Sequence, residues 1–189
     1  PVTGCLRGCE YCYARRIAER FGNKYMPYGD EINVLDKPTD GEKGIDPYPF
    51  GFEPTFHRYR LGEPARKKRP RNIFVCSMAD LFGEWVPDEW IQAVFAACEA
   101  APQHRYMFLT KNPKRYEQVL DRYFPPNMWF GWSQTGPAND PLGFNTHQSA
   151  QTFISIEPLL NPFMTFNIKG IDWAIIGAET GNRKEKVIP

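Results

Sequence analysis

The sequence has 189 residues, enough for one domain with a substantial hydrophobic core. Hydrophobic residues make up 42% and charged residues 24% of the chain, and the formal net charge of +1 gives no reason to expect a polyanionic partner. No apolar run approaches the ~20 residues needed to span a bilayer, and the N-terminus does not resemble a signal peptide. We therefore expect a soluble, cytoplasmic protein with no membrane partner.

The first predicted element is a helix over residues 12–21, which are good helix formers and are followed by Gly22 and Asn23, a stop signal. The next segment, residues 23–52, is rich in proline and glycine but also contains several tyrosines and phenylalanines. Disordered segments are poor in aromatic residues. We therefore expect residues 23–52 to form an ordered inserted loop or lid.

From residue 52 onward the sequence alternates between strand-like and helix-like patterns. Apolar residues recur at helical spacing within residues 87–102 and 112–124, which predicts two helices. Nearly continuous apolar runs, typical of parallel strands covered on both faces, predict strands. These runs are residues 52–57, 72–77, 106–110, 128–133, 152–157 and 173–179. The alternation predicts an α/β fold with mostly parallel strands, arranged as a sheet or a barrel.

Most of these apolar runs end in polar residues. In parallel α/β folds the carboxyl ends of the strands lie on one face, where binding sites are built. The recurrence therefore predicts a site on that face, although polar residues can also simply mark where strands leave the core. The candidates are Ser77, Asp80, Thr110, Lys111, Ser133, Glu157 and Glu179.

Three of the five cysteines are crowded into the N-terminal region as Cys5, Cys9 and Cys12, with the spacing C-x3-C-x2-C. A structural zinc site needs four ligands, and the histidines are remote in sequence. A thioredoxin-like pair would leave Cys5 unexplained. A [4Fe–4S] cluster held by only three cysteines leaves one iron without a protein ligand, and that iron can take a small molecule.

The segment CLRGCEYC (5–12), with Tyr11 before the last cysteine, resembles the signature of the radical S-adenosylmethionine superfamily. Further segments resemble, more narrowly, a phage-associated family of that superfamily whose reaction is unassigned: PVTGC, GFEPTFH, FVCSMADLFGEWVPDEW, LTKNPKR, SIEPLL and DWAIIGAETG. Members usually carry a strand before PVTGC and a helical part after the last glycine-rich turn. The resemblance implies that residues 1–189 form a single partial (β/α) barrel of the radical S-adenosylmethionine type, a fragment lacking both flanking parts.

The resemblance further implies that Cys5, Cys9 and Cys12 each ligate one iron of a [4Fe–4S] cluster. S-adenosyl-L-methionine would bind the open iron and be cleaved reductively to a 5′-deoxyadenosyl radical, which abstracts hydrogen from an unknown substrate. A one-electron reductant such as flavodoxin or ferredoxin would supply the electron. Tyr11 would flank the adenine or shield the cluster, and Gly4 and Gly8 would permit φ-positive turns in the loop.

The strand-end residues become candidate S-adenosylmethionine ligands, with Asp80, Ser133 and Glu157 foremost because carboxylates and hydroxyls suit the ammonium and ribose groups. The alternative is a non-catalytic iron–sulfur or zinc-binding protein, associated with nucleic acid through the basic run 65–71, which otherwise is a solvated connection. A nucleotide or nucleic acid is also a candidate substrate. Cys76 and Cys98 are expected to be core thiols.

Overall fold

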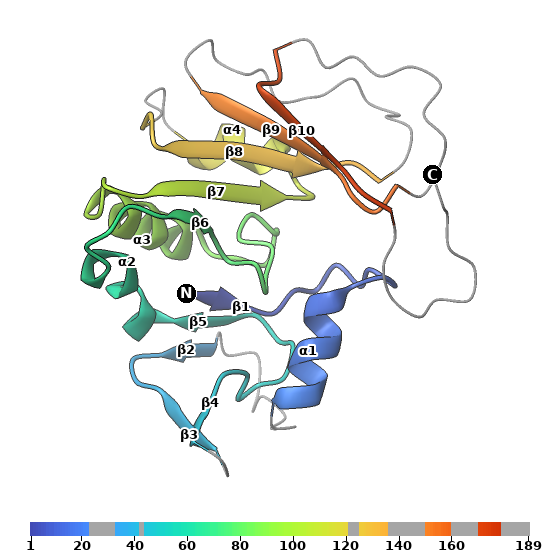
Figure 1. Cartoon of the computed structure of the whole chain (residues 1–189). Coiled ribbons are helices and arrows are strands. Elements are labelled where there is room, and N and C mark those ends of the chain that lie inside the picture. Colours follow the sequence, from blue (N-terminus) through green and yellow to red (C-terminus); the bar gives the residue numbers. More distant parts are fainter. Residues whose placement is uncertain (23–32, 42–43, 121–124, 136–149, 160–169, 179–189) are drawn as a thin grey trace.

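The computed structural model describes residues 1–22, 33–41, 44–120, 125–135, 150–159 and 170–178. Its centre is a five-stranded parallel sheet in the order β10-β9-β8-β7-β6 (Figure 1). The strands are β6 (Asn72–Phe74), β7 (Arg105–Thr110), β8 (Met128–Ser133), β9 (Gln151–Ile156) and β10 (Trp173–Ile176). The predicted α/β class and parallel strands are confirmed, and the arrangement is compatible with a partial barrel.

The central strands are held together by buried aromatic side chains. Phe108 of β7 and Phe130 of β8 are partners in the strand register, and their rings stack with centroids 5.4 Å apart. Both side chains are almost completely buried, and each such burial stabilises the fold by roughly 1.5–3 kcal/mol. Cover of the sheet is uneven: Thr152–Ile156 of β9 are all buried, whereas buried residues alternate with exposed or half-buried ones along β7, and the edge strands β6 and β10 have no buried residue.

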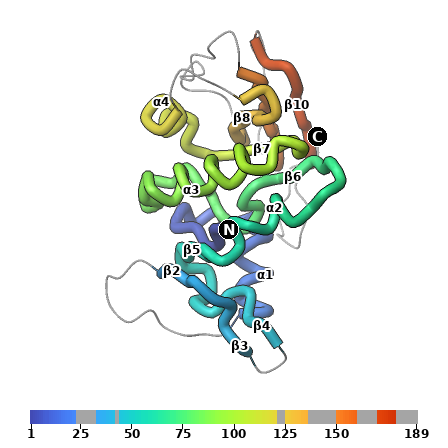
Figure 2. Tube along the Cα trace, turned by 90° about the vertical axis from the view of Figure 1, so that its left-hand side faces the viewer, coloured from blue at the N-terminus to red at the C-terminus, as the bar shows by residue number. Residues whose placement is uncertain are grey.

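Helices α3 (Asp88–Glu99) and α4 (Lys114–Val119) lie on one face of this sheet (Figure 2). Helix α3 buries the stripe predicted from helical spacing, including Ile91, Val94, Phe95 and Cys98. Helix α4 falls inside the predicted range 112–124, whose residues 121–124 lie outside the described part of the chain. None of the helices in the described residues is long and apolar enough to cross a membrane.

A second sheet, in the order β1-β5-β2, lies beside the first. Strand β1 (Val2–Thr3) pairs antiparallel with β5 (Thr55–His57), which pairs parallel with β2 (Asn33–Leu35). The Gly4 N–H donates to the Met78 carbonyl at 2.9 Å, and Gly4 forms a parallel bridge with Ala79. The chain that follows β1 therefore starts beside the carboxyl end of β6.

The segment predicted as a loop or lid contains regular structure in its described part. Besides β2, it forms an antiparallel hairpin of β3 (Thr39–Gly41) and β4 (Gly44–Asp46). Three-residue strands in a segment rich in proline and glycine leave too short a pattern to be recognised in the sequence. Residues 23–32 and 42–43 of the predicted lid lie outside the described residues.

The remaining differences from the predicted elements concern ends and short helices. The strand expected at 72–77 ends at Phe74, because Cys76 adopts a left-handed backbone conformation with φ of 54° and turns the chain toward Gly4. A 3-10 helix η1 (Arg58–Arg60) and a short helix α2 (Glu63–Arg66) follow β5. Helix α1 (Tyr13–Phe21) confirms the helix predicted after the cysteines.

Candidate functional site

The cysteine loop, residues 5–12, joins β1 to α1 at the end of the molecule toward which the arrows of β7 and β8 point (Figure 1). Backbone hydrogen bonds fix the loop: the Cys5 N–H donates to the Phe52 carbonyl at 3.1 Å, and the Cys12 N–H to the Cys9 carbonyl at 3.2 Å. The loop is therefore tied to Phe52 at its first residue and closes in a turn at its last.

Two glycines, one just before the loop and one within it, allow the chain to turn. Gly4 has φ of 85° and Gly8 has φ of 72°, so the predicted φ-positive turns are confirmed. At Gly4 a Cβ would lie 2.1 Å from the Glu53 carbonyl oxygen, whereas nothing lies within 4 Å of a Cβ at Gly8. Gly4 is therefore required both by its conformation and by close packing, and Gly8 by conformation alone.

The three thiols of the loop face a common cavity of about 360 Å³. All five cysteines of the chain are free thiols, and Cys5, Cys9 and Cys12 are half-buried. Cys12 caps α1, because the Arg15 N–H donates to its Sγ at 3.3 Å. The amino end of α1 thus lies at the Cys12 thiol, where the helix dipole favours negative charge.

The electrostatics of the cavity oppose ionisation of the first cysteine. Burial raises the pKa of the Cys5 thiol above its usual value, and the neighbouring Asp80, Cys9 and Cys12 raise it further. Three thiolates in one small cavity would repel one another. A cation in the cavity would reverse this balance, because metal binding favours the deprotonated thiols.

The three thiols can be compared with the needs of two kinds of metal centre. Within the described residues, no group of three or more histidine, cysteine, aspartate or glutamate side chains is placed so that it could hold a metal ion. A zinc ion needs its sulfur ligands close together, at about 2.3 Å from the metal. Three free thiols around one cavity suit a larger group whose metal atoms each take one cysteine, and the donor set fits an iron–sulfur cluster.

The cavity also brings together the predicted strand-end residues. Every one of them within the described chain lines it, and so does Tyr11, although they come from loops and strands far apart in sequence. Glu179 lies outside the described residues. The candidates at the cavity are Tyr11, Ser77, Asp80, Thr110, Lys111, Ser133 and Glu157.

Asp80 is the most extensively bonded of these residues. Its carboxylate accepts hydrogen bonds from the Thr110 hydroxyl at 2.6 Å, the Lys111 N–H at 3.0 Å and the Phe82 N–H at 3.2 Å. Arg7 Nε lies 3.9 Å from its second oxygen. The three hydrogen bonds fill most of the roughly four acceptor positions of a carboxylate, and Arg7 adds an ion pair. Asp80 therefore ties the end of β7 to the cysteine loop and has little capacity left for a ligand.

Aromatic residues of the loop contact the ends of neighbouring strands. The Lys111 ammonium lies over the Tyr11 ring, 5.2 Å from its centroid, in a cation–π contact. The Tyr13 hydroxyl donates to the Ser77 carbonyl at 2.6 Å. Burial raises the pKa of Tyr13, so this hydroxyl stays protonated and remains a donor. Lys111 is thus placed on an aromatic ring rather than left as a solvated side chain.

The polar groups that remain for a ligand come from β8 and β9. Within the described residues, no hydrogen bond or ion pair engages the Ser133 hydroxyl or the Glu157 carboxylate. Ser155, buried beside the cavity, is the register partner of Ser133 and was missed by the sequence analysis. Alternation along β9 places Ser155 on the same side as Glu157, and this period of two is the signal that could have identified it.

Glu157 reaches the cavity beside Gly177. A Cβ at Gly177 would lie 2.8 Å from Glu157 Oε1, so the absence of a side chain there leaves room for the carboxylate. Sequence analysis also missed Arg7, Arg16 and Phe52, which line the same cavity. They lie in loops or on a helix and follow no strand-end pattern.

Two other predicted residues take structural roles. Cys98 is buried in α3, and burial raises its pKa to about 12, so it is an inert core thiol as expected. Cys76 is also buried, in agreement with the prediction, but it borders the cavity.

A model of one protein family, described as "Protein of unknown function (DUF5131)", matches residues 1–189. The chain belongs to this family. No curated protein and no solved structure matches it. The description of the DUF5131 family names no reaction, so the function has to be argued from the cavity itself.

In this DUF5131 protein the cavity combines two kinds of group. Its lining includes three thiols beside the amino end of a helix, here called the thiol wall, and hydroxyls and a carboxylate from the ends of parallel strands, the strand-end wall. The thiol wall suits a metal cluster, and the strand-end wall suits a ligand with an ammonium group and hydroxyls. Both sets of groups line the same cavity of about 360 Å³.

Proposed function

We propose that this protein is a radical S-adenosylmethionine enzyme that holds a [4Fe–4S] cluster with Cys5, Cys9 and Cys12 and binds S-adenosylmethionine in the same cavity. The observation that carries the proposal is the convergence of three free thiols and strand-end polar groups on one cavity of about 360 Å³. The C-x3-C-x2-C spacing with Tyr11 supports it. The parallel sheet would then be a partial barrel of the radical S-adenosylmethionine type.

When bound, the cluster with S-adenosylmethionine supplies one-electron cleavage of the sulfonium and abstraction of a hydrogen atom from the substrate. The protein holds the cluster with its thiols, and the amino end of α1 stabilises negative charge beside Cys12. Glu157 accepts hydrogen bonds from the ammonium group of S-adenosylmethionine, because its carboxylate lines the cavity.

Ser133 and Ser155 bind the ribose hydroxyls, since they lie side by side at the ends of β8 and β9. Asp80 acts as a positioning residue: it holds Thr110, the Lys111 backbone and Arg7 in place rather than contacting the ligand. Tyr11, with Lys111 over its ring, covers the cavity and excludes water. The chain's own groups thus bind, orient and shield.

Anaerobic reconstitution with ferrous iron and sulfide, followed by reduction with dithionite in the presence of S-adenosylmethionine, tests the proposal. We expect about four iron atoms per chain and the absorbance band of an iron–sulfur cluster. We also expect 5′-deoxyadenosine to be formed and detected by chromatography. Cys9→Ala should lose both the cluster and the nucleoside. Cys98→Ala is the matched control, because Cys98 lies in α3 and does not line the cavity.

Three outcomes would contradict the proposal. Full nucleoside production by Cys9→Ala would remove Cys9 from the ligand set. A cluster that assembles but leaves S-adenosylmethionine intact would favour a non-catalytic iron–sulfur protein. Stoichiometric zinc with tetrahedral sulfur coordination in the purified protein would favour the zinc alternative.

A further inference from the structure

Arg15 of α1 contacts both ends of the cysteine loop. Its backbone N–H donates to Cys12 Sγ at 3.3 Å, and its side-chain Nη2 donates to the Cys5 carbonyl at 3.4 Å. Cys5 and Cys12 are the first and the last of the three cysteines in the loop. A single residue of the helix therefore links the two outer cysteines.

The Phe52 ring holds the guanidinium of Arg15. The Arg15 Cζ atom lies over that ring, 4.9 Å from its centroid, in a cation–π contact. The Phe52 carbonyl accepts the Cys5 N–H at 3.1 Å, so both backbone polar groups of Cys5 are bonded within this set. Arg15, Phe52 and Cys5 thus form a closed triangle of contacts, in which each contact restrains the groups that make the other two.

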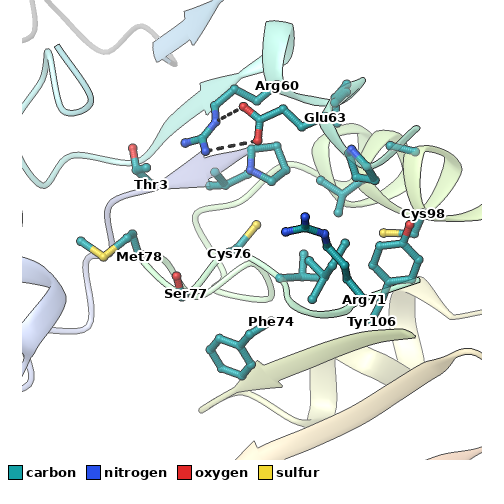
Figure 3. A pocket seen from close by; sticks show the side chains of 18 of the residues that line it. Thr3, Arg60, Glu63, Arg71, Phe74, Cys76, Ser77, Met78, Cys98 and Tyr106 are labelled. Carbon is teal, nitrogen blue, oxygen red and sulfur yellow. Dashed lines mark hydrogen bonds and ion pairs between the residues drawn. The ribbon is translucent and has the colours of Figure 1, made fainter. Parts of the chain in front are cut away.

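The charge of Arg15 is not neutralised by an ion pair. None of the ion pairs among the residues that the structure describes includes Arg15. Figure 3 shows the opposite case: Arg60 donates from Nε and Nη2 to the two carboxylate oxygens of Glu63, at 2.9 Å and 3.3 Å. A guanidinium stays protonated in proteins. Arg15 therefore places a permanent positive charge beside the backbone of Cys5.

Arg15 lies behind the lining of the cavity rather than in it. Phe52 lines the cavity that the cysteine loop borders, and Arg15 does not. A group bound in the cavity therefore does not contact Arg15 directly. It is affected by Arg15 through the positions of Cys5 and Cys12, and through the electrostatic field, which water screens less at a half-buried position than at an exposed one.

We propose that Arg15 is a positioning residue of the cysteine loop: it holds Cys5 and Cys12 in the arrangement that binds the metal centre, and its charge makes that centre easier to reduce. This inference rests on the proposed function, because it takes the metal centre to be the [4Fe–4S] cluster. Reduction adds one electron to the site and so one unit of negative charge. A nearby cation stabilises the added charge, and net charge is one of the quantities that set the reduction potential of such clusters.

The test uses protein reconstituted anaerobically with ferrous iron and sulfide, and compares two substitutions of Arg15. Arg15→Met removes the charge and the side-chain hydrogen bond to Cys5 but keeps an unbranched, helix-forming side chain. Arg15→Lys keeps the charge but loses the planar fork. Two quantities are measured: the midpoint potential, by a redox titration followed by electron paramagnetic resonance, and the rate at which a chelator removes iron.

We expect Arg15→Met to shift the midpoint potential to a more negative value and to lose iron about ten-fold faster than the wild type, as is typical when a residue that holds metal ligands is removed. Arg15→Lys should keep the wild-type potential, because the charge is retained. It should still lose iron faster than the wild type, because an ammonium group does not reproduce the geometry of the guanidinium.

Arg20→Met is the matched control, because it removes the same charge from the same helix. The Arg20 guanidinium lies over the Phe21 ring, 5.0 Å from its centroid, at the far end of α1 from the cysteines. Both the midpoint potential and the rate of iron loss should match the wild type. An equal shift of the potential in Arg20→Met and Arg15→Met would overturn the proposal.

The midpoint potential separates this proposal from a merely structural role. If Arg15 only stabilised the fold, Arg15→Met would lose iron faster while the remaining cluster kept the wild-type potential, and that result would also overturn the proposal. Urea denaturation of the cluster-free proteins shows whether each variant folds. Arg15→Gln, which removes the charge but keeps a polar side chain, replaces Arg15→Met if the latter does not fold, and we expect the same shift.

The same measurements keep this proposal distinct from the proposed function. A wild-type cluster whose potential is unchanged by the loss of the Arg15 charge refutes the role of Arg15 and leaves the enzyme standing. The expected shifts in a protein that does not cleave S-adenosylmethionine support the role of Arg15 and refute the enzyme. A wild type that takes up no cluster refutes both.

Discussion

Asp80 and Thr110 are joined by a buried hydrogen bond of 2.6 Å at the end of β7, and the same Thr110 oxygen accepts the Asn112 N–H at 2.9 Å. The carboxylate also holds the Lys111 N–H, so the chain leaving β7 is shaped around it. This pair connects the sheet to the side of the cavity where Arg7 approaches from the cysteine loop. The geometry of the cavity therefore depends on a hydrogen bond between two side chains of the protein itself.

Thr110→Val keeps the shape of the side chain but removes both of its hydrogen bonds. The buried Asp80 carboxylate loses a donor and the Asn112 N–H loses its acceptor, so we expect the free energy of unfolding to fall by about 2–3 kcal/mol. Urea denaturation measures this. Thr39→Val, at a half-buried position on β3, is the control and should change stability by less than about 0.5 kcal/mol. Equal effects of the two substitutions would contradict the role of Asp80 as an anchor.

Gly4→Ala, just before the cysteine loop, and Gly8→Ala, within it, separate the effect of backbone conformation from that of packing. Both positions have positive φ, so each alanine should cost about 1 kcal/mol from conformation. Only the Gly4 Cβ would meet a backbone oxygen, at 2.1 Å from Glu53, and this should raise the loss to about 3 kcal/mol or more. Urea denaturation of the two variants provides the comparison. A Gly8 variant as unstable as the Gly4 variant would show that the close approach is not a constraint.

His57 makes stability depend on pH. It is buried, and its Nε2 lies 2.8 Å from the Thr3 hydroxyl oxygen. Burial, helped by nearby positive charge, lowers the pKa of His57 from 6.5 to about 4. Between these values the unfolded chain binds a proton that the folded protein does not. Above pH 6.5, proton uptake by His57 in the unfolded chain does not lower the free energy of unfolding. As the pH falls toward 4, it lowers the free energy of unfolding by up to ~1.4 kcal/mol per pH unit.

Urea denaturation at neutral pH and near pH 5, for the wild type and for His57→Gln, isolates this contribution. The carboxylates titrate in both proteins, whereas only the wild type carries an imidazole at position 57. We expect the wild type to lose more stability on acidification than the variant does. The same loss in both would mean that His57 is protonated in the folded state.

Gly177→Ala should act on the ligand through Glu157. The added Cβ would lie 2.8 Å from Glu157 Oε1 and displace the carboxylate from its place beside the cavity. In the reconstituted protein we expect Gly177→Ala and Glu157→Gln each to weaken S-adenosylmethionine binding about ten-fold, measured by equilibrium dialysis.

The double variant provides the control. Because both changes remove the same carboxylate contact, the combined effect should be close to that of either alone. Additive losses would show that Gly177 affects the ligand by another route. Glu117→Gln, on α4 and not among the residues that line the cavity, should leave the affinity unchanged.

Local pattern was sufficient for the elements with long, regular periodicity. The helical stripe around Ile91 and Phe95, the apolar runs of β7 to β9 and the helix after Cys12 all appear where their spacing predicts. The three-residue strands of residues 33–46 gave no such pattern, because they pair through backbone groups that any residue supplies. The early end of β6 was also hidden, since it depends on the left-handed conformation of Cys76.

The sequence by itself determined that polar residues follow the strands and that three cysteines precede a helix; parallel strands then require these groups to meet at one end of the sheet. Only the tertiary structure decided how each group is used. Asp80 meets Thr110 across thirty positions of the chain and becomes an anchor, Ser155 enters the cavity, and the buried His104 accepts a hydrogen bond from the Arg71 N–H at the end of the basic run. Hydrogen-bond partners of buried groups are chosen by which distant segments pack together, and periodicity along a chain carries no record of that choice.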